Sequence, residues 1–200
     1  MTTARLEAFS DGVFAIIITI MVLELRVPDH PDWNALARLT PVFLTYALSF
    51  VNVGIYWVNH HHMFHLCDRV TGRVLWANLH LLFWLSLTPF TTGWMGENHF
   101  AAVPTAVYGI DLLCSALAYT TLQAAIIRGQ GSDSPLAAAV RGDVKGKLSM
   151  ALYVMAIPLA FVNQWISDAL YVTVAMTWFI PDRRIERRMR TENTPPSAHV

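Results

Sequence analysis

The chain has 200 residues, of which 54 % are hydrophobic and only 14 % are charged. Soluble domains average about 25 % charged residues, so this composition excludes an ordinary soluble protein and favours an integral membrane protein. The formal net charge is zero and the two cysteines lie in separate segments, so we expect no nucleic-acid partner, no disulfide framework and no thiolate metal site.

The first predicted element is a membrane helix over residues 6–25 with an acid near its start. Asp11 follows Arg5 and Ser10 and precedes the Ile-rich part of the run. A carboxylate at membrane depth costs about 2.5–3.5 kcal/mol on insertion scales, so Asp11 requires a partner or a function. The run lacks a basic leader and a small-residue cleavage site, so we expect it to be retained as a span.

One face of this first helix carries branched aliphatic side chains. At about 100° per residue, the face consists of Ile16, Ile20 and Leu23, with Thr19 at its flank and Gly12 on the same side. Asp11 points about 140° away from Ile16. Such a stripe is typical of a helix–helix core, and it also fits the lining of a pore that constricts an ion path.

Five further apolar runs predict an all-α membrane protein with six spans. We expect these spans at residues 39–58, 72–94, 102–127, 146–162 and 166–180, with a short interfacial helix over 136–147. The last two spans form a predicted hairpin, and the alternative is a single long helix over 148–180. Pro158 is expected to kink the fifth span and Pro181 to end the sixth.

Lys and Arg are distributed unequally between the two sides of these spans. Of the fourteen such residues, twelve fall on the side of the N-terminus. They are Arg5, Arg69, Arg73, Arg128, Arg141, Lys145, Lys147, Arg183, Arg184, Arg187, Arg188 and Arg190. The positive-inside rule therefore predicts that both termini lie in the cytoplasm. We expect a multi-pass protein of the cell (inner) membrane.

Polar side chains from three spans are predicted to meet at the depth of Asp11, where each would satisfy the others internally. The expected structural network consists of Arg5, Ser10, Asp11, His60, His61, Asn78 and His80. His61 and His65 have i, i+4 spacing, which also suggests a zinc site. No H-E-x-x-H pattern or cysteine cluster accompanies them, so we expect no metal.

Asp111 is a second acid within a span, since it lies in the middle of the fourth. Acids at this depth are functional candidates by default, and pairing with a Tyr, Asn or His of the same bundle is the alternative. Together with Asp11 and the histidines, Asp111 would form the relay of a proton-coupled membrane transporter, which is the alternative function for this chain.

Three sequence patterns in the first half of the chain resemble those of a known family. They are R-x-x-x-F-S-D (Arg5, Phe9, Ser10, Asp11), the W-x-x-H-H-x-x-F pattern within residues 55–64, and the N-x-x-x-L and P-F-x-T patterns that begin at Asn78 and at Pro89. In this order they resemble the transmembrane-protein-175 family of endosomal and lysosomal potassium channels, in its single-repeat bacterial branch.

The resemblance implies a homotetramer in the lipid bilayer, with six helices per subunit and the first helix lining a central pore. It implies that Ile16, Ile20 and Leu23 form the pore constriction and that Thr19 and Gly12 flank it. The implied function is a passive potassium-preferring channel for monovalent cations that needs no cofactor. The chain has no Thr-Val-Gly-Tyr-Gly loop, so selectivity would not come from a carbonyl-lined filter.

No nucleophile elbow, P-loop or Rossmann glycine pattern occurs in the sequence, so we expect no enzymatic activity. A metal-dependent membrane enzyme would be supported only by the histidine cluster. The first-span motif has no second copy. We therefore expect one channel domain over residues 1–190 and a disordered cytoplasmic tail over 191–200.

Overall fold

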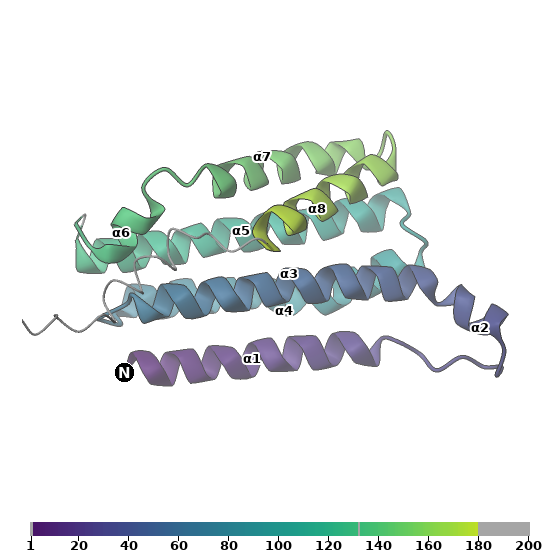
Figure 1. The fold of residues 1–200 in the computed structure, drawn as a ribbon, viewed down its shortest axis with the longest axis horizontal. Helices are drawn as coiled ribbons and strands as arrows, with labels where there is room; N and C mark the ends of the chain where they lie inside the picture. Colours follow the sequence, from purple (N-terminus) through teal and green to yellow (C-terminus); the bar gives the residue numbers. More distant parts are fainter. Residues whose placement is uncertain (1, 132, 180–200) are drawn as a thin grey trace, which may run out of the picture.

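The computed structural model describes residues 2–131 and 133–179, and this part of the chain is built from helices (Figure 1). In chain order they are α1 (Thr3–Leu23), α2 (Trp33–Arg38), α3 (Thr40–His65), α4 (Gly72–Glu97), α5 (Ala102–Gln130), α6 (Pro135–Val140), α7 (Val144–Leu159) and α8 (Gln164–Phe179). The predicted all-α class is confirmed. The predicted tail over 191–200 and the expected helix end at Pro181 lie outside the described residues.

Four of these helices, α1, α3, α4 and α5, are long and apolar enough to cross a membrane. They have between 21 and 29 residues. The helices α7 and α8 have 16 residues each, which corresponds to a length of about 24 Å. A count of six spans therefore requires that these two short helices cross the membrane as well.

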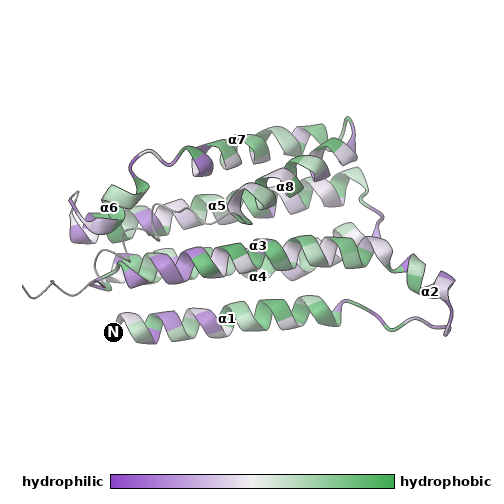
Figure 2. Ribbon diagram, in the orientation of Figure 1, coloured by the Kyte–Doolittle hydropathy of each residue, from purple (hydrophilic) through white to green (hydrophobic). Residues whose placement is uncertain are grey.

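The long helices run antiparallel along one common direction (Figure 1). One end of the bundle holds the start of α1, the end of α3, the start of α4 and the end of α5. Figure 2 shows polar residues concentrated towards this end of α1 and α3, with apolar residues along the rest of both helices. Helix α1 packs against α3 and α4. On the other side of the bundle, α7 packs against α5, and α8 packs against α7, α3 and α5.

Two apolar cores follow from this arrangement. The first joins α1, α3, α4 and α5 through buried side chains such as Phe14, Ile17, Leu81 and Leu122. The second joins α4, α5, α7 and α8 around two tyrosines, Tyr108 and Tyr171, which are both fully buried. The chain therefore has a core on either side of the α4–α5 pair.

Small residues let neighbouring helices approach closely at two points. A Cβ atom at Gly109 of α5 would clash with the Tyr171 hydroxyl of α8. That hydroxyl donates to the Thr105 carbonyl at 3.2 Å, which ties α8 to α5. A Cβ atom at Gly96 of α4 would lie 2.8 Å from Val42 Cα of α3. Close packing over small residues is typical of helices in membranes.

The structure differs from the sequence expectations at several helix ends. Helix α3 continues to His65 instead of ending near residue 58, so the histidine run lies on a helix. Helix α6 ends at Val140, because Gly142 has a φ of 89° and Asp143 starts a new helix by accepting from the Gly146 amide at 2.9 Å. The predicted helix over 136–147 is thus two helices.

The C-terminal part of the described chain forms a hairpin and not one long helix. A turn after Ala160 separates α7 from α8, and the Ser167 hydroxyl of α8 donates to the Ala156 carbonyl of α7 at 2.7 Å. Pro158 lies in the last turn of α7, where it precedes the helix end. The short helix α2 was not expected. It begins at Trp33 because Asp32 accepts from the Ala35 amide at 2.7 Å.

Candidate ion pathway and its polar anchor

Helix α1 has two faces with opposite surroundings. The face packed on α3 and α4 is buried, and Ile17 there is only 2 % exposed. On the other face Ile16 is 58 % exposed, Ile20 43 % and Leu23 78 %. Gly12 and Thr19 are exposed as well. The predicted stripe is therefore not part of the subunit's own core, and it is open to lipid, to another subunit or to a pore.

Few polar groups lie along this exposed face. The Thr19 hydroxyl donates to the Ile16 carbonyl of its own helix at 2.9 Å. Glu24, at the C-terminal end of α1, is the next ionisable residue after Asp11 along the helix, and it is exposed. A path along this face would therefore be lined by aliphatic side chains with one hydroxyl per chain.

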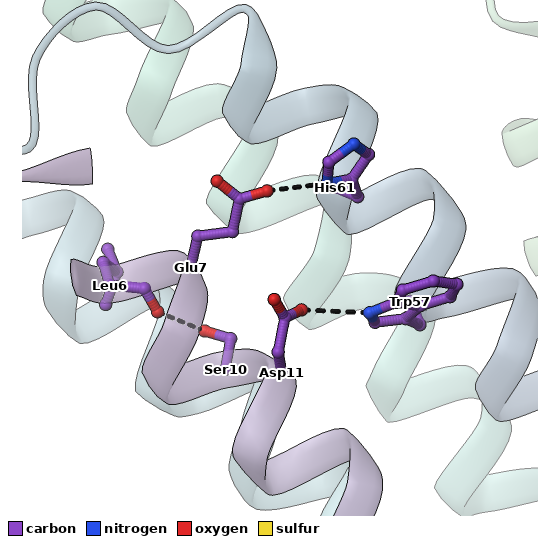
Figure 3. A network of polar contacts seen from close by, with 6 residues as sticks. All are labelled: Leu6, Glu7, Ser10, Asp11, Trp57 and His61. Atoms are coloured by element: carbon purple, nitrogen blue, oxygen red, sulfur yellow. Dashed lines mark hydrogen bonds and ion pairs between the residues drawn. The ribbon is translucent and has the colours of Figure 1, made fainter. Parts of the chain in front are cut away.

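Two acids tie the N-terminal half of α1 to α3 (Figure 3). Glu7 Oε1 lies 2.6 Å from His61 Nδ1, and the Trp57 indole N–H donates to Asp11 Oδ1 at 2.9 Å. Glu7 and Asp11 are one turn apart on α1, as are His61 and Trp57 on the antiparallel α3. The two contacts lie one helical turn apart between α1 and α3, and together they fix the rotation of α1 about its own axis.

A third connection joins α1 to both α3 and α4 through buried groups. His60 Nε2 lies 2.8 Å from Asn78 Oδ1, the Asn78 amide donates to Ser10 Oγ at 2.9 Å, and the Ser10 hydroxyl donates to the Leu6 carbonyl at 2.9 Å. All three side chains are fully buried. Since the Asn78 oxygen only accepts, the His60 proton lies on Nε2.

The structure does not bring all the expected network residues together. Arg5 is exposed, and among residues 2–131 and 133–179 its side chain forms no hydrogen bond or ion pair with the other members. His80 is also exposed, and its Nε2 accepts from the Trp84 indole one turn along α4 at 3.0 Å. The polar anchor, as we use the term below, is therefore Glu7, Ser10, Asp11, Trp57, His60, His61 and Asn78.

Sequence reasoning missed Glu7 and Trp57 as members of the polar anchor. Both lie one helical turn from an expected member, since Glu7 precedes Asp11 by four residues and Trp57 precedes His61 by four. That shared spacing on two antiparallel helices was the signal available in the sequence. We expected the second span to end at residue 58, so Trp57 and His61 were not recognised as neighbours on one helix.

The histidines of α3 are arranged around this anchor. His61 and His65 stack with ring centroids 5.5 Å apart, and His61 also contacts Glu7. Across the described part of the chain, no three His, Cys, Asp or Glu side chains gather in a way that would hold a metal ion.

Asp111 is held in a different part of the bundle. The hydroxyls of Thr88 and Thr91 on α4 donate to its Oδ2 at 3.1 and 3.2 Å. Its other oxygen is buried without a partner among the described residues. A neighbouring hydroxyl cluster links Ser49, Thr92 and Tyr108 across α3, α4 and α5. Among the described residues, no hydrogen bond connects Asp111 to the polar anchor.

Comparison with known proteins places these features in a family. The family model "Endosomal/lysosomal potassium channel TMEM175" matches residues 5–89. A potassium channel of Chryseobacterium sp. (strain P1-3) is 53 % identical over 190 residues, which cover 95 % of this chain and 99 % of that protein. A potassium channel of Streptomyces collinus is 34 % identical, over 87 % of this chain and 90 % of that one.

A solved structure has the same fold. The crystal structure of a lysosomal potassium-selective channel TMEM175 homolog from Chamaesiphon minutus matches with a TM-score of 0.79 and 31 % identity, over 91 % of this chain and 97 % of that chain. With the four long apolar helices, these similarities identify a multi-pass membrane protein of the ion-channel class, not an enzyme.

Proposed function

This chain belongs to the TMEM175 family of endosomal/lysosomal potassium channels, and from that premise we propose that it forms a passive, potassium-preferring cation channel. In this proposal four copies surround a central pore, each copy contributes six spans, and α1 of each copy lines the pore. No cofactor is required, and the permeant ions are monovalent cations.

The observation that carries this proposal is the exposed aliphatic stripe of α1 opposite a fully packed face. The polar anchor holds Glu7 and Asp11 against α3, so α1 is fixed with Ile16, Ile20 and Leu23 directed away from its own subunit. A pore lined by one helix per chain requires several chains around a symmetry axis, since the other helices of a single subunit would otherwise fill it.

Aliphatic rings would select ions by the cost of removing water. Side chains of Ile16, Ile20 and Leu23 cannot replace the hydration shell of an ion as backbone carbonyls do. A narrow ring of them favours the ion that loses part of its shell more easily, which is potassium over sodium. The expected discrimination is modest, and the Thr19 hydroxyl is the group on this face able to contact a partly dehydrated ion.

Orientation in the membrane follows from the basic residues. The end of the bundle that holds the N-terminus carries seven of them in the described part of the chain: Arg5, Arg69, Arg73, Arg128, Arg141, Lys145 and Lys147. The opposite end carries Arg26, which pairs with Glu97 at 3.1 Å, and Arg38. We infer that the N-terminal end faces the cytoplasm, which places both termini on that side of six spans.

The alternative of a proton-coupled transporter has less support. A relay through Asp11 and Asp111 needs continuous hydrogen-bonded groups between them. Asp11 contacts Trp57 of α3, whereas Asp111 contacts two threonines of α4 in a separate group. The named relatives are also channels.

Flux measurements on the purified full chain in liposomes test the proposal. A channel gives passive flux that follows a potassium gradient and is slower under a matched sodium gradient. Flux that occurs only when a pH gradient is imposed would instead establish the coupled carrier. Mass determination in mild detergent should return four copies per particle.

Substitutions on the two faces of α1 test the pore assignment. Ile16→Asn should raise conductance and reduce the preference for potassium over sodium, because ions would pass with more of their water. Leu23→Ala should change conductance and ion preference in the same direction, but by less. Ile17→Asn, on the buried face, should lower the yield of assembled protein and leave the reversal potential of the assembled fraction unchanged. If Ile17→Asn alters selectivity and Ile16→Asn does not, α1 presents its other face to the ions.

A further inference from the structure

We propose that a groove between α4 and α5, at the end of the bundle that holds the N-terminus, binds the phosphate group of an anionic phospholipid. With the orientation proposed above, this lipid belongs to the cytoplasmic leaflet. The groove has a volume of about 890 Å³. Its lining residues are Thr71, Gly72, Arg73, Trp76, Ala77, His80, Thr121, Ala125, Arg128 and Gly129.

The charge of the groove is uncompensated. Arg73 at the start of α4 and Arg128 near the end of α5 are both exposed, and neither forms an ion pair within the described part of the chain. No carboxylate lines the groove. Two guanidinium groups on facing helices supply the donors that a phosphodiester accepts from, whereas the Thr121 hydroxyl already donates to the Leu117 carbonyl of its own helix at 2.8 Å. Basic pockets between membrane helices on the cytoplasmic side bind lipid head groups in this way.

The walls of the groove lie close together where α5 ends beside the loop that precedes α4. A Cβ atom at Gly129 of α5 would lie 3.8 Å from Thr71 Cγ2, next to the start of α4. The Gln130 amide of α5 also donates to the Leu66 carbonyl at 2.9 Å, which holds the end of α5 to the loop that precedes α4. Arg73 and Arg128 are therefore carried by a fixed part of the fold.

Apolar surface continues from the groove along both helices, and this favours a lipid over a soluble anion. On α4, Trp76, Phe83 and Phe90 repeat at seven-residue spacing and are 76 %, 55 % and 64 % exposed. On α5, Leu117 and Ile110 lie in the same helical row as Arg128 and are also exposed. Acyl chains that follow these two rows would keep the phosphate beside the arginines.

Native mass spectrometry on the purified full chain tests this site. The protein is titrated with phosphatidylglycerol, which is anionic, and with phosphatidylcholine, which is not. We expect several-fold more phosphatidylglycerol than phosphatidylcholine retained per subunit. In the double variant Arg73→Gln, Arg128→Gln the apparent affinity for phosphatidylglycerol should fall about twenty-five-fold, since each basic side chain at an anionic membrane surface contributes about fivefold.

A matched control separates this groove from general surface charge. The double variant Arg141→Gln, Lys147→Gln removes the same charge from the same end of the bundle, at exposed positions on the α6–α7 side. It should retain the wild-type preference for phosphatidylglycerol. Equal losses in both double variants would show that binding is unspecific attraction to the basic end, and would overturn the proposal.

Two further outcomes would also overturn it. Displacement of phosphatidylglycerol by millimolar inorganic phosphate would identify a site for free anions. A change of subunit number in the Arg73→Gln, Arg128→Gln variant, with lipid retention unchanged, would identify the groove as a contact between copies of the chain. Lipid binding is measured without ion flux, so a negative binding result leaves the proposed channel function untouched. A negative flux result likewise leaves the proposed lipid site untouched.

Discussion

At the scale of single residues, the buried amide of Asn78 is the centre of the polar anchor. It accepts from His60 and donates to Ser10, so it connects α4 to α3 and α1. Asn78→Ala would leave a buried donor and a buried acceptor without partners, and each such group costs about 1–3 kcal/mol. We expect the variant to unfold at a lower temperature and to assemble less well, as measured by thermal unfolding and size-exclusion chromatography in detergent.

Asn59→Ala is the matched control for this prediction. Asn59 lies on α3 one residue before His60, and among the described residues its side-chain amide donates only to the Ile55 carbonyl of the same helix at 2.8 Å. The identical substitution there should have a much smaller effect on unfolding. If Asn78→Ala and Asn59→Ala lower the unfolding temperature by similar amounts, the connection between helices contributes little beyond a local hydrogen bond.

Residues on one helix could be placed from sequence, whereas partners on other helices could not. The stripe of Ile16, Ile20 and Leu23 on one face and Ile17 on the other follows from the helical repeat alone, and burial in the structure separates these faces. The partner of Asp11 depends on which turn of α3 stands opposite it. That register is set by tertiary packing, and it selects Trp57 over the expected histidines and asparagines.

At the scale of elements, Gly109 determines how closely α8 approaches α5. Gly109→Ala should push the Tyr171 hydroxyl away and break its hydrogen bond to the Thr105 carbonyl, at a cost of about 1–3 kcal/mol. Limited proteolysis of the α7–α8 hairpin and thermal unfolding would both report this loss.

Gly54→Ala on α3 provides the comparison, because a Cβ atom at Gly54 meets nothing within 4 Å. Ala is favoured over Gly by about 1 kcal/mol within a helix, so this variant should be neutral or slightly stabilised. A stable Gly109→Ala variant would show that α8 can shift on α5 without cost.

Helix positions were predictable where apolar runs are long, and less so where a helix begins or ends at a single capping side chain. The expected third and fourth spans at 72–94 and 102–127 fall within α4 and α5, because each run has a clear loop on both sides. Helix α2 and the break between α6 and α7 depend on single side chains, Asp32 and Asp143, that accept from backbone amides. Short helices of this kind carry no apolar periodicity, so the pattern of hydrophobic residues does not indicate them.

At the scale of the whole molecule, the proposed orientation predicts which loops are accessible from outside the cell. His30→Cys, in the exposed segment between α1 and α2, should react with a membrane-impermeant maleimide on intact cells. Asp133→Cys, after α5, should react only once the cells are permeabilised. The reverse labelling pattern would show that the N-terminal end of the bundle faces the outside of the cell.

The native cysteines should give little background in this experiment. Cys67 lies between α3 and α4, and burial raises the pKa of its thiol above the ordinary value. Less of the reactive thiolate is therefore present at neutral pH. Cys114 lies within α5 and is only partly accessible.

The different helix lengths make each subunit unequal in height across the membrane. Helices α3, α4 and α5 extend over about 39 Å or more, whereas α7 and α8 reach about 24 Å, compared with a hydrocarbon layer of about 30 Å. In a six-span arrangement the surrounding lipid must compress beside the α7–α8 hairpin and not beside α4. Such hydrophobic mismatch on one flank would favour thin membranes, and it would draw the compressed flanks of separate channels towards one another.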